Sequence, residues 1–139
     1  MTEYRKPLPH AQGESRHYWD GARDHELWLR RCNGCGDAYF YPRDISPCCF
    51  SRDTEWILSS GRASLFTFTI VHRSPHPAFQ ADAPFVVALV KLEEGPLMAT
   101  NIVDLPDPPG PEDLQIGMAL QVVFDDVTDE VTLPKFRPA

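Results

Sequence analysis

The chain has 139 residues, of which 42% are hydrophobic and 24% charged, and its formal net charge is −7. This length predicts one domain, or one small domain with an appendage, that is large enough to bury a core. The composition is typical of a soluble globular protein, and no apolar run approaches the about 20 residues that a membrane-spanning helix needs. The polar, proline-containing first ten residues do not have the pattern of a secretory signal, so we expect a cytoplasmic protein with no membrane partner.

The charge is unevenly distributed along the chain. Residues 1–60 carry a net −1, whereas residues 61–139 carry −6. A surface that binds nucleic acid normally needs a basic stripe to neutralise phosphates, so the acidic second half argues against nucleic acid as a partner. A local basic patch stays open as an alternative, because four arginines flank the cysteines: Arg30, Arg31, Arg43 and Arg52.

The first residues predict an arm followed by a short helix. Residues 1–13 contain Pro7, Pro9 and Gly13, which argue against regular structure, and we expect a flexible arm there. Ser15 is a suitable cap for a helix over residues 15–24, whose apolar side carries Tyr18, Trp19 and Ala22. Residues 26–31 then predict a short strand that leads into the first cysteine.

All four cysteines of the chain lie within residues 32–49. Cys32 and Cys35 form a Cys-x-x-Cys turn followed by a glycine, and twelve residues separate this turn from the adjacent Cys48 and Cys49. A turn of this kind directs two sulfurs at one point, and a second cysteine cluster at this distance is the pattern of a zinc ribbon. The sequence therefore predicts a Zn2+ site whose candidate ligands are Cys32, Cys35, Cys48 and Cys49.

The second half of this motif is irregular. Ser46 occupies the position at which a regular second knuckle would have its first cysteine. Three arrangements are open: Cys48 completes a distorted four-sulfur site, a nearby histidine, aspartate or water completes a three-sulfur site, or the fold persists without metal. A redox Cys-x-x-Cys would need a βαβ context, a disulfide framework would suit a secreted chain, and an iron-holding electron carrier would need two regular knuckles.

Beyond Gly61 the pattern changes to strands separated by proline-rich loops. Residues 62–73, 85–92, 97–103, 119–124 and 131–133 predict five strands, with loops at 74–84 and 105–111, one helical turn near 112–117 and a tail at 134–139. We expect a mainly β protein, with a short helix and zinc ribbon over residues 14–60 and a five-stranded OB-fold barrel over residues 61–139. An SH3-like barrel or a small sandwich is the alternative.

Several segments together resemble one known family. They include Tyr18-Trp19-Asp20-Gly21, residues 27–36, Pro47-Cys48-Cys49-Phe50-Ser51, Ala83-Pro84-Phe85 and Phe136-Arg137-Pro138. Their order and spacing resemble the acyl-CoA-associated proteins built from an N-terminal helix, a rubredoxin-like zinc ribbon and a C-terminal OB barrel, a family long described as a domain of unknown function. The resemblance covers nearly everything after the arm, and Ser46 at a ligand position is its main departure.

The resemblance implies a function without catalysis by this chain itself. Members of the family are accessory subunits of thiolase-fold enzymes, such as acetyl-CoA acetyltransferases, acyltransferases and steroid side-chain retro-aldolases, and some are fused to hot-dog-fold hydratases. It implies a structural zinc and a thiolase-like or aldolase partner in a hetero-oligomer, with a heterotetramer as one arrangement. It assigns no catalytic residue here, and acyl-CoA would be contacted through the partner.

Two other functions compete with this interpretation. A single-stranded nucleic-acid-binding OB protein would stack bases on aromatic side chains, with Tyr39, Tyr41, Phe66 and Phe68 as candidates. A stand-alone acyl-CoA enzyme would need a general base, with His72 or His76 near Asp82 as candidates. We also expect the arm and the tail to become ordered on a partner, because neither has the periodicity to fold alone.

Overall fold

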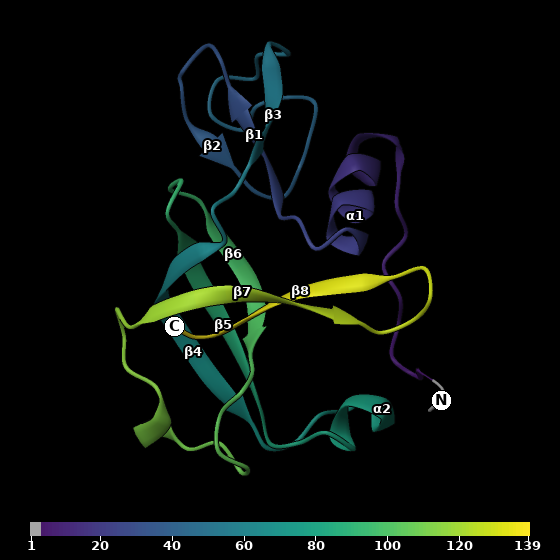
Figure 1. Cartoon of the computed structure of the whole chain (residues 1–139), viewed down its shortest axis with the longest axis vertical. Helices are drawn as coiled ribbons and strands as arrows, with labels where there is room; N and C mark the ends of the chain where they lie inside the picture. Colours follow the sequence, from purple (N-terminus) through teal and green to yellow (C-terminus); the bar gives the residue numbers. More distant parts are fainter. Residues whose placement is uncertain (1–3) are drawn as a thin grey trace.

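The computed structural model describes residues 4–139. A one-turn 3-10 helix, η1 (Gly13–Ser15), leads into helix α1 (Arg16–Arg23), which stands beside a small sheet of three strands (Figure 1). The remaining strands form a closed barrel below this sheet (Figure 1). The mainly β architecture, with one short N-terminal helix, a zinc-ribbon region and a closed five-strand OB-type barrel, confirms the predicted fold class.

The small sheet carries the cysteine motif. Its order is β2-β1-β3, with β1 (Trp28–Cys32) in the centre, paired antiparallel to β2 (Ala38–Tyr39) and β3 (Thr54–Leu58). Leu29 and Cys32 of β1 are fully buried. The central strand therefore ends with its last side chain, Cys32, pointing into the space between the two cysteine turns.

Helix α1 packs its apolar side against the rest of the chain, as its sequence pattern predicts. Tyr18 and Ala22 are buried, and the helix contacts both β1 of the small sheet and β8 of the barrel. At its start, the amide of Gln12 donates to Ser15 Oγ and the amide of Ser15 donates to the Gln12 carbonyl, each over 3.0 Å. Ser15 is the N-cap residue of α1, as expected, but its side chain makes no capping hydrogen bond to α1, and its hydroxyl closes the turn of η1 instead. Helix α1 joins the small sheet to the barrel.

The barrel is formed by five strands in the order β4-β5-β6-β8-β7, with β4 and β7 closing it. The strands are β4 (Arg62–Val71), β5 (Phe85–Leu92), β6 (Leu97–Ile102), β7 (Ala119–Asp126) and β8 (Thr132–Pro138). Alternate residues of β5 point inward and are buried, as expected for a strand with one face on a core. The core also receives Leu65, Met98, Leu120 and Phe136.

The expectation of a separate C-terminal tail is wrong. Residues 134–139 do not form a separate tail, because β8 continues through Pro138 and pairs with β7 along its length. The Phe136 carbonyl accepts the Val103 amide just beyond β6, so the backbone hydrogen-bonding groups of the even-numbered residues of β8 point away from β7. Pro134 and Pro138, which are even-numbered, therefore remove no hydrogen bond to β7. The prolines are therefore compatible with an inner strand here.

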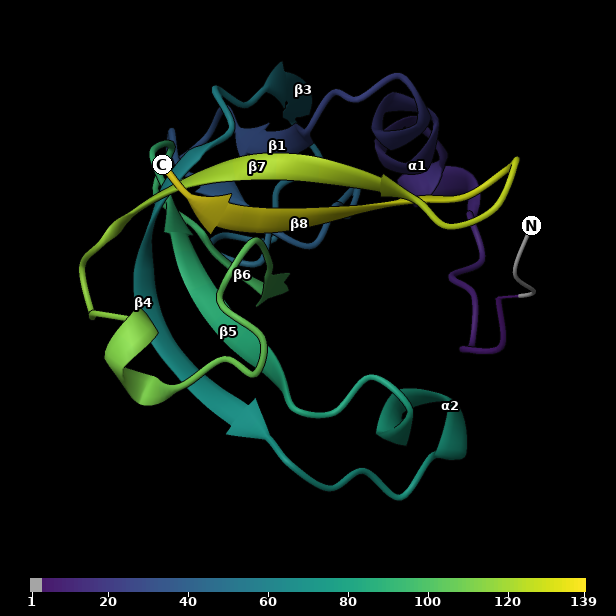
Figure 2. The same ribbon diagram turned by 60° about the horizontal axis from the view of Figure 1, so that its bottom comes forward.

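The proline-rich segments also contain short helices. Helix α2 (Pro77–Gln80) lies inside the predicted loop 74–84, and its first turn is capped by His76, whose Nδ1 accepts the Ala78 amide over 3.1 Å. The predicted helical turn near 112–117 is found slightly earlier, as the 3-10 helix η2 (Pro111–Asp113). The loop that carries α2 extends away from one end of the barrel (Figure 2). Within residues 4–139, no helix has both the length and the apolar character to cross a membrane.

Candidate zinc site and the surfaces around it

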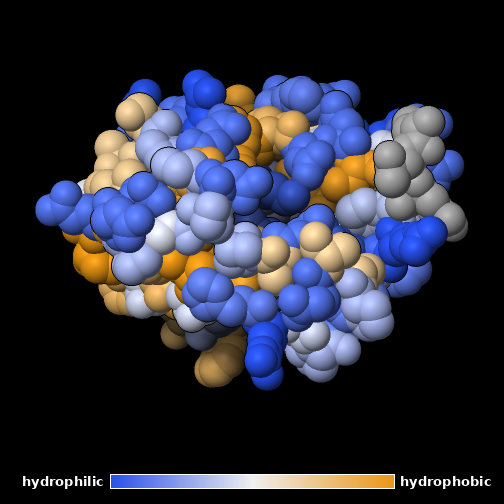
Figure 3. Space-filling model, turned by 90° about the horizontal axis from the view of Figure 1, so that it is seen from below, coloured by the Kyte–Doolittle hydropathy of each residue, from blue (hydrophilic) through white to orange (hydrophobic). Residues whose placement is uncertain are grey.

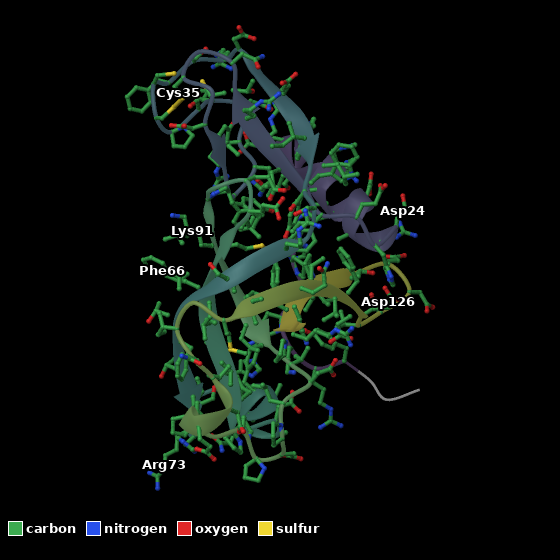
Figure 4. The ribbon with its side chains drawn as sticks, turned by 60° about the vertical axis from the view of Figure 1, so that its left-hand side comes forward. Asp24, Cys35, Phe66, Arg73, Lys91 and Asp126 are labelled. Carbon is green, nitrogen blue, oxygen red and sulfur yellow. A yellow bond between two sulfur atoms is a disulfide. The ribbon has the colours of Figure 1, made fainter. Side chains whose placement is uncertain are left out.

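The four cysteines meet at the far end of the small sheet. Their sulfur atoms all lie within 4.8 Å of one another, and Cys32 Sγ is 3.4 Å from Cys49 Sγ. Cys32 is buried, whereas the other three are exposed, and Figure 4 shows the sulfurs near Cys35 at the end of the molecule that is remote from the barrel. The sulfurs of both turns thus converge on one point.

Ser46 contributes to this site without replacing a sulfur. It is fully buried, and its Oγ lies 2.9 Å from Cys48 Sγ while accepting the Cys48 amide over 3.2 Å. The Ser46 hydroxyl, followed by the Cys35 backbone amide, lowers the pKa of the Cys32 thiol below its ordinary value. The hydroxyl therefore favours thiolates at the centre, a supporting role that sequence reasoning missed because it treated Ser46 only as a lost ligand.

The spacing of Cys35 and Cys48 bears on the choice between metal and disulfide. Their sulfurs are bonded in the structure, with Cys32 and Cys49 free, and their Cα atoms are 7.4 Å apart. The Cα atoms of two disulfide-bonded cysteines usually lie about 4.4–6.8 Å apart, so the Cα atoms of Cys35 and Cys48 are further apart than is usual for a disulfide. A separation of this size is better suited to two ligands of one ion.

The donor set fits zinc. With Zn–S bonds of about 2.3 Å, neighbouring sulfurs of a tetrahedral site lie about 3.8 Å apart, which is within the 4.8 Å that encloses these four sulfurs. Four cysteines from two turns are also the usual ligand set of a closed structural site. Cys32, Cys35, Cys48 and Cys49 would hold the ion, which would tie the two turns together because the small sheet has little core of its own.

The arginines that flank the cysteines are mostly engaged within the chain. Arg30 lies largely buried against the ring of Trp56, 4.8 Å from its centroid, and its Nη2 bonds Thr54 Oγ1. Arg31 pairs with Glu55 over 2.6 Å. Arg43 pairs with Glu14 over 3.1 Å, so two of the four arginines are paired with carboxylates, while Arg30 is removed from the surface by burial.

The four aromatic residues proposed to stack bases do not share a surface. Tyr39 is buried, Phe68 packs against the barrel core, and Tyr41 accepts the indole N–H of Trp19 over 2.8 Å. Phe66 instead points outward and is half exposed. These positions do not form the row of aromatic faces that a base-stacking platform requires.

The candidate general bases of the stand-alone enzyme also have other roles. His76 Nδ1 is used as the cap of α2, and His72 is exposed on the preceding turn. Asp82 forms an ion pair with Lys6 of the arm. The geometry thus joins Asp82 to the arm and directs the His76 ring nitrogen to the backbone.

The arm lies across one mouth of the barrel. Tyr4, Lys6 and Pro7 line a pocket of about 320 Å³ together with residues of α2, β5, β6 and β8, among them Phe79 and Ile102. Lys6 also lies over the Phe79 ring, 5.5 Å from its centroid. Figure 3, which views this end of the molecule, shows a hollow near its centre with a largely hydrophilic rim.

Beside the arm, an open groove is lined by five carboxylates from α1 and the residue after it, the end of β7 and the β7–β8 turn: Asp20, Asp24, Asp125, Asp126 and Asp129. Asp126 is held by Thr132 Oγ1 over 2.6 Å and by His25 Nε2 over 3.0 Å. These two hydrogen bonds, Thr132 first, lower the pKa of Asp126 below its ordinary value. Figure 4 shows Asp24 and Asp126 on the same side of the molecule.

Two family models match consecutive parts of the chain. Residues 19–55 match the rubredoxin-like zinc ribbon domain of ChsH2, and residues 56–125 match the C-terminal OB-fold domain of ChsH2. The division between the two models falls within β3, close to the boundary between the small sheet and the barrel.

Relatives of two lengths match the sequence. A DUF35 domain-containing scaffold protein of Methanocaldococcus jannaschii is 39% identical over 102 residues, which are 72% of this chain and 68% of the relative. A second such scaffold protein, from Pyrococcus furiosus, is 36% identical over 128 residues and 90% covered. A probable enoyl-CoA hydratase alpha subunit of Thermomonospora curvata is 32% identical over 134 residues. The matched region covers 96% of this chain but only 40% of that relative.

Two solved structures share the fold. A chain of the Ltp2-ChsH2(DUF35) aldolase superposes with a TM-score of 0.78 and 32% identity, covering 94% of this chain and 98% of the other. A DUF35 protein of unknown function from Sulfolobus solfataricus superposes with a TM-score of 0.61 and 12% identity, which shows the fold alone.

Proposed function

The chain belongs to the ChsH2/DUF35 zinc-ribbon and OB-fold scaffold family, and from this premise we propose that it is an accessory subunit of a thiolase-fold acyl-CoA enzyme. It docks on that enzyme and supports its acyl-CoA site or channel, while the partner carries the chemistry. The observation that carries the proposal is the structural match to one chain of the Ltp2-ChsH2(DUF35) aldolase. The match covers 94% of this chain and 98% of that chain.

The arrangement of side chains supports a role in assembly. Of the candidates for an acid–base mechanism, His76 caps a helix, Asp82 pairs with Lys6, and His72 is exposed on the preceding turn. The four cysteines are gathered at one point, where they serve as ligands to one ion in place of a single activated nucleophile. These features suit a chain whose rigid parts position another protein.

In this proposal the zinc ion is structural. Cys32, Cys35, Cys48 and Cys49 hold it, and it fixes the two turns at the end of the small sheet. The arm rearranges when the partner binds, because among residues 4–13 the ion pair to the rest of the chain is Lys6–Asp82, and a pair of this kind contributes little to stability.

The partner that we propose is a thiolase-like retro-aldolase or a thiolase, bound in a hetero-oligomer such as a heterotetramer. Two relatives are named hydratase alpha subunits, from Thermomonospora curvata and Mycobacterium tuberculosis, and this chain spans 40% and 37% of them. A hot-dog-fold hydratase is therefore a second candidate partner. We place the complex in the cytoplasm, where reduced cysteines and acyl-CoA occur together.

The test is affinity purification of the tagged chain from its native host, with mass spectrometry of the co-eluting proteins and a zinc assay on the same sample. We expect a thiolase-fold protein in stoichiometric amount and about one zinc per chain. The purified complex should then turn over acyl-CoA, whereas the isolated chain should not.

Two results would contradict the proposal. Acyl-CoA turnover by the isolated chain would identify an enzyme, and recovery of nucleic acid without a thiolase-fold protein would favour the nucleic-acid-binding alternative. Co-elution of a hot-dog-fold hydratase alone would retain an accessory role but replace the partner.

A further inference from the structure

The outer face of strands β4, β5 and β6 carries few charges apart from the Arg62–Glu93 ion pair at one end of it. Strand pairing places nine outward residues in three rows: Ser64, Lys91 and Leu97; Thr67, Leu89 and Ala99; and Thr69, Val87 and Asn101. Lys91 is the one charged residue among the nine, and no acidic residue occurs there, although the chain has twenty aspartates and glutamates. Charge on this face is therefore limited to Lys91 and to the Arg62–Glu93 pair of the adjoining row.

A β-bulge adds an aromatic side chain to this face. The pairing between β4 and β5 shifts between Leu65 and Thr67, so that Phe66 is the extra residue. Leu65 points into the core, whereas Phe66 and Thr67 are both exposed. Bulges re-aim side chains in this way, and this one turns a phenylalanine outward, leaving it 51% exposed.

A loop residue extends the apolar part of the face. The Gly117 amide donates to the Leu65 carbonyl over 2.8 Å, and the Leu65 amide donates to Met118 over 3.0 Å. These bonds place Ile116, which is 59% exposed, on the segment that runs beside the bulge. We name the nine outward residues, Phe66 and Ile116 together the barrel face.

We propose that the barrel face is the surface on which the thiolase-fold partner docks, with Phe66 and Ile116 as its exposed apolar anchors at the β4 edge. This inference rests on the proposed function. The cores of protein interfaces are depleted of charge and often contain aromatic residues, and this face combines few charges with one half-exposed aromatic side chain, Phe66. Figure 4 shows Phe66 and Lys91 projecting from one side of the barrel, away from the cysteines and from the acidic groove.

Two observations indicate what covers the face. This chain aligns with 98% of the related chain in the two-component aldolase. The surface with which that relative contacts its partner therefore lies within the shared fold. A second copy of this chain is a poorer occupant, because two chains with a net charge of −7 repel each other. The occupant is therefore a different protein with an apolar, weakly charged docking patch.

The experiment uses the full-length chain and the thiolase-fold protein that co-purifies with it. The variant Phe66→Asp/Ile116→Asp should weaken the purified binary complex at least about 30-fold, because loss of an interface anchor typically costs about 2 kcal/mol or more. Phe66→Ala/Ile116→Ala is the milder variant and should weaken it less. Both should keep the wild-type melting temperature and zinc content, because both side chains are exposed.

The control is Phe50→Asp, which makes the same change at another exposed phenylalanine, at the cysteine end of the molecule. It should bind the partner as the wild type does. If Phe50→Asp abolishes binding and the barrel-face variants do not, the docking surface is the cysteine end and the inference is wrong.

Failure of the inference and failure of the proposed function give different results. If a thiolase-fold protein co-purifies but binds the aspartate variant with wild-type affinity, only the docking surface is overturned. If no thiolase-fold protein co-purifies, the proposed function fails and the inference with it. If the wild-type chain alone is a dimer that the aspartate variant converts to a monomer, a second copy covers the face instead.

Discussion

Gly21 of α1 lies directly against the indole of Trp28, the first residue of β1. A Cβ atom at position 21 would be 2.3 Å from Trp28 Cδ1 and 2.8 Å from its Nε1, far closer than side-chain carbons approach one another. The glycine, which weakens the helix when judged by sequence alone, is therefore what allows the helix to approach the small sheet.

Gly21→Ala should destabilise the protein by about 1–2 kcal/mol, because overpacking outweighs the about 1 kcal/mol that alanine gains over glycine in a helix. In a Trp28→Ala background the same change should stabilise it. Chemical denaturation of the four proteins of this double-mutant cycle gives the sign directly. Gly13→Ala is the control, because a Cβ there meets nothing within 4 Å. Stabilisation by Gly21→Ala in the wild-type background would show that the indole moves away at little cost.

Ser46→Ala should weaken zinc binding about 10-fold while leaving one zinc per chain, because groups that hydrogen-bond metal ligands typically change affinity by about 10–100-fold. The change removes the hydroxyl that lies 2.9 Å from Cys48 Sγ. Competition with a chromogenic chelator measures the affinity. Cys32→Ser should instead abolish stoichiometric zinc and lower the melting temperature.

The matched control is Ser60→Ala, since Ser60 bonds the Arg62 amide remote from the cysteines. Wild-type zinc affinity in Ser46→Ala would mean that the hydroxyl only fills space. Wild-type zinc affinity in Cys32→Ser would remove that cysteine from the ligand set.

Thr132→Val should raise the pKa of the Asp126 carboxyl, because the Thr132 hydroxyl is the largest cause of its lowered value. A carboxyl whose pKa is lowered by folding stabilises the native state above its unfolded pKa, and this contribution is lost as the pH falls through its folded pKa. The variant should therefore lose less stability than the wild type on acidification below about pH 4.

Carbon-detected NMR titration of Asp126 measures the pKa, and thermal unfolding across the same pH range measures the linkage. His25→Gln should raise the pKa by less than Thr132→Val, because the His25 bond is the smaller cause. A larger effect of His25→Gln would reverse this order and make the contact between α1 and the barrel the main cause.

Phe136→Ala should destabilise the barrel by about 3–5 kcal/mol, the usual result of truncating a fully buried phenylalanine. Phe136 lies where β8 meets both of its neighbours, opposite Val122 of β7 and Ile102 of β6. Equilibrium denaturation measures the change. Phe66→Ala is the control and should lie within about 0.5 kcal/mol of the wild type. Comparable losses in both variants would place Phe66 in the core.

Deletion of residues 2–11 should weaken binding to the co-purified partner while changing the melting temperature little. The deletion removes the Lys6–Asp82 pair, and exposed pairs contribute about 0–1 kcal/mol, but it keeps the Gln12–Ser15 hydrogen bonds at the start of the helix. Calorimetric titration with the purified partner measures binding. Unchanged affinity would restrict the arm to covering the barrel mouth.

Local patterns were sufficient to predict the cysteine cluster, the helix and the positions of the five barrel strands along the chain. The two cysteine turns bring their own sulfurs together, because each turn is closed by backbone geometry within a few residues. The alternation of apolar residues in β5 likewise depends only on the period of a strand, so its inward face could be identified without knowing its neighbours.

Long-range pairing decided the features that sequence patterns did not resolve. Phe66 and Phe68 have the spacing of residues on one face of a strand, yet a bulge opposite β5 turns Phe66 outward and leaves Phe68 against the core. Residues 134–138 have the prolines of a loop, yet they form a strand. This is possible because the proline nitrogens point away from β7, so no hydrogen bond to β7 is lost. In each case the outcome depends on which neighbouring strand supplies the hydrogen bonds, and only the tertiary structure determines that.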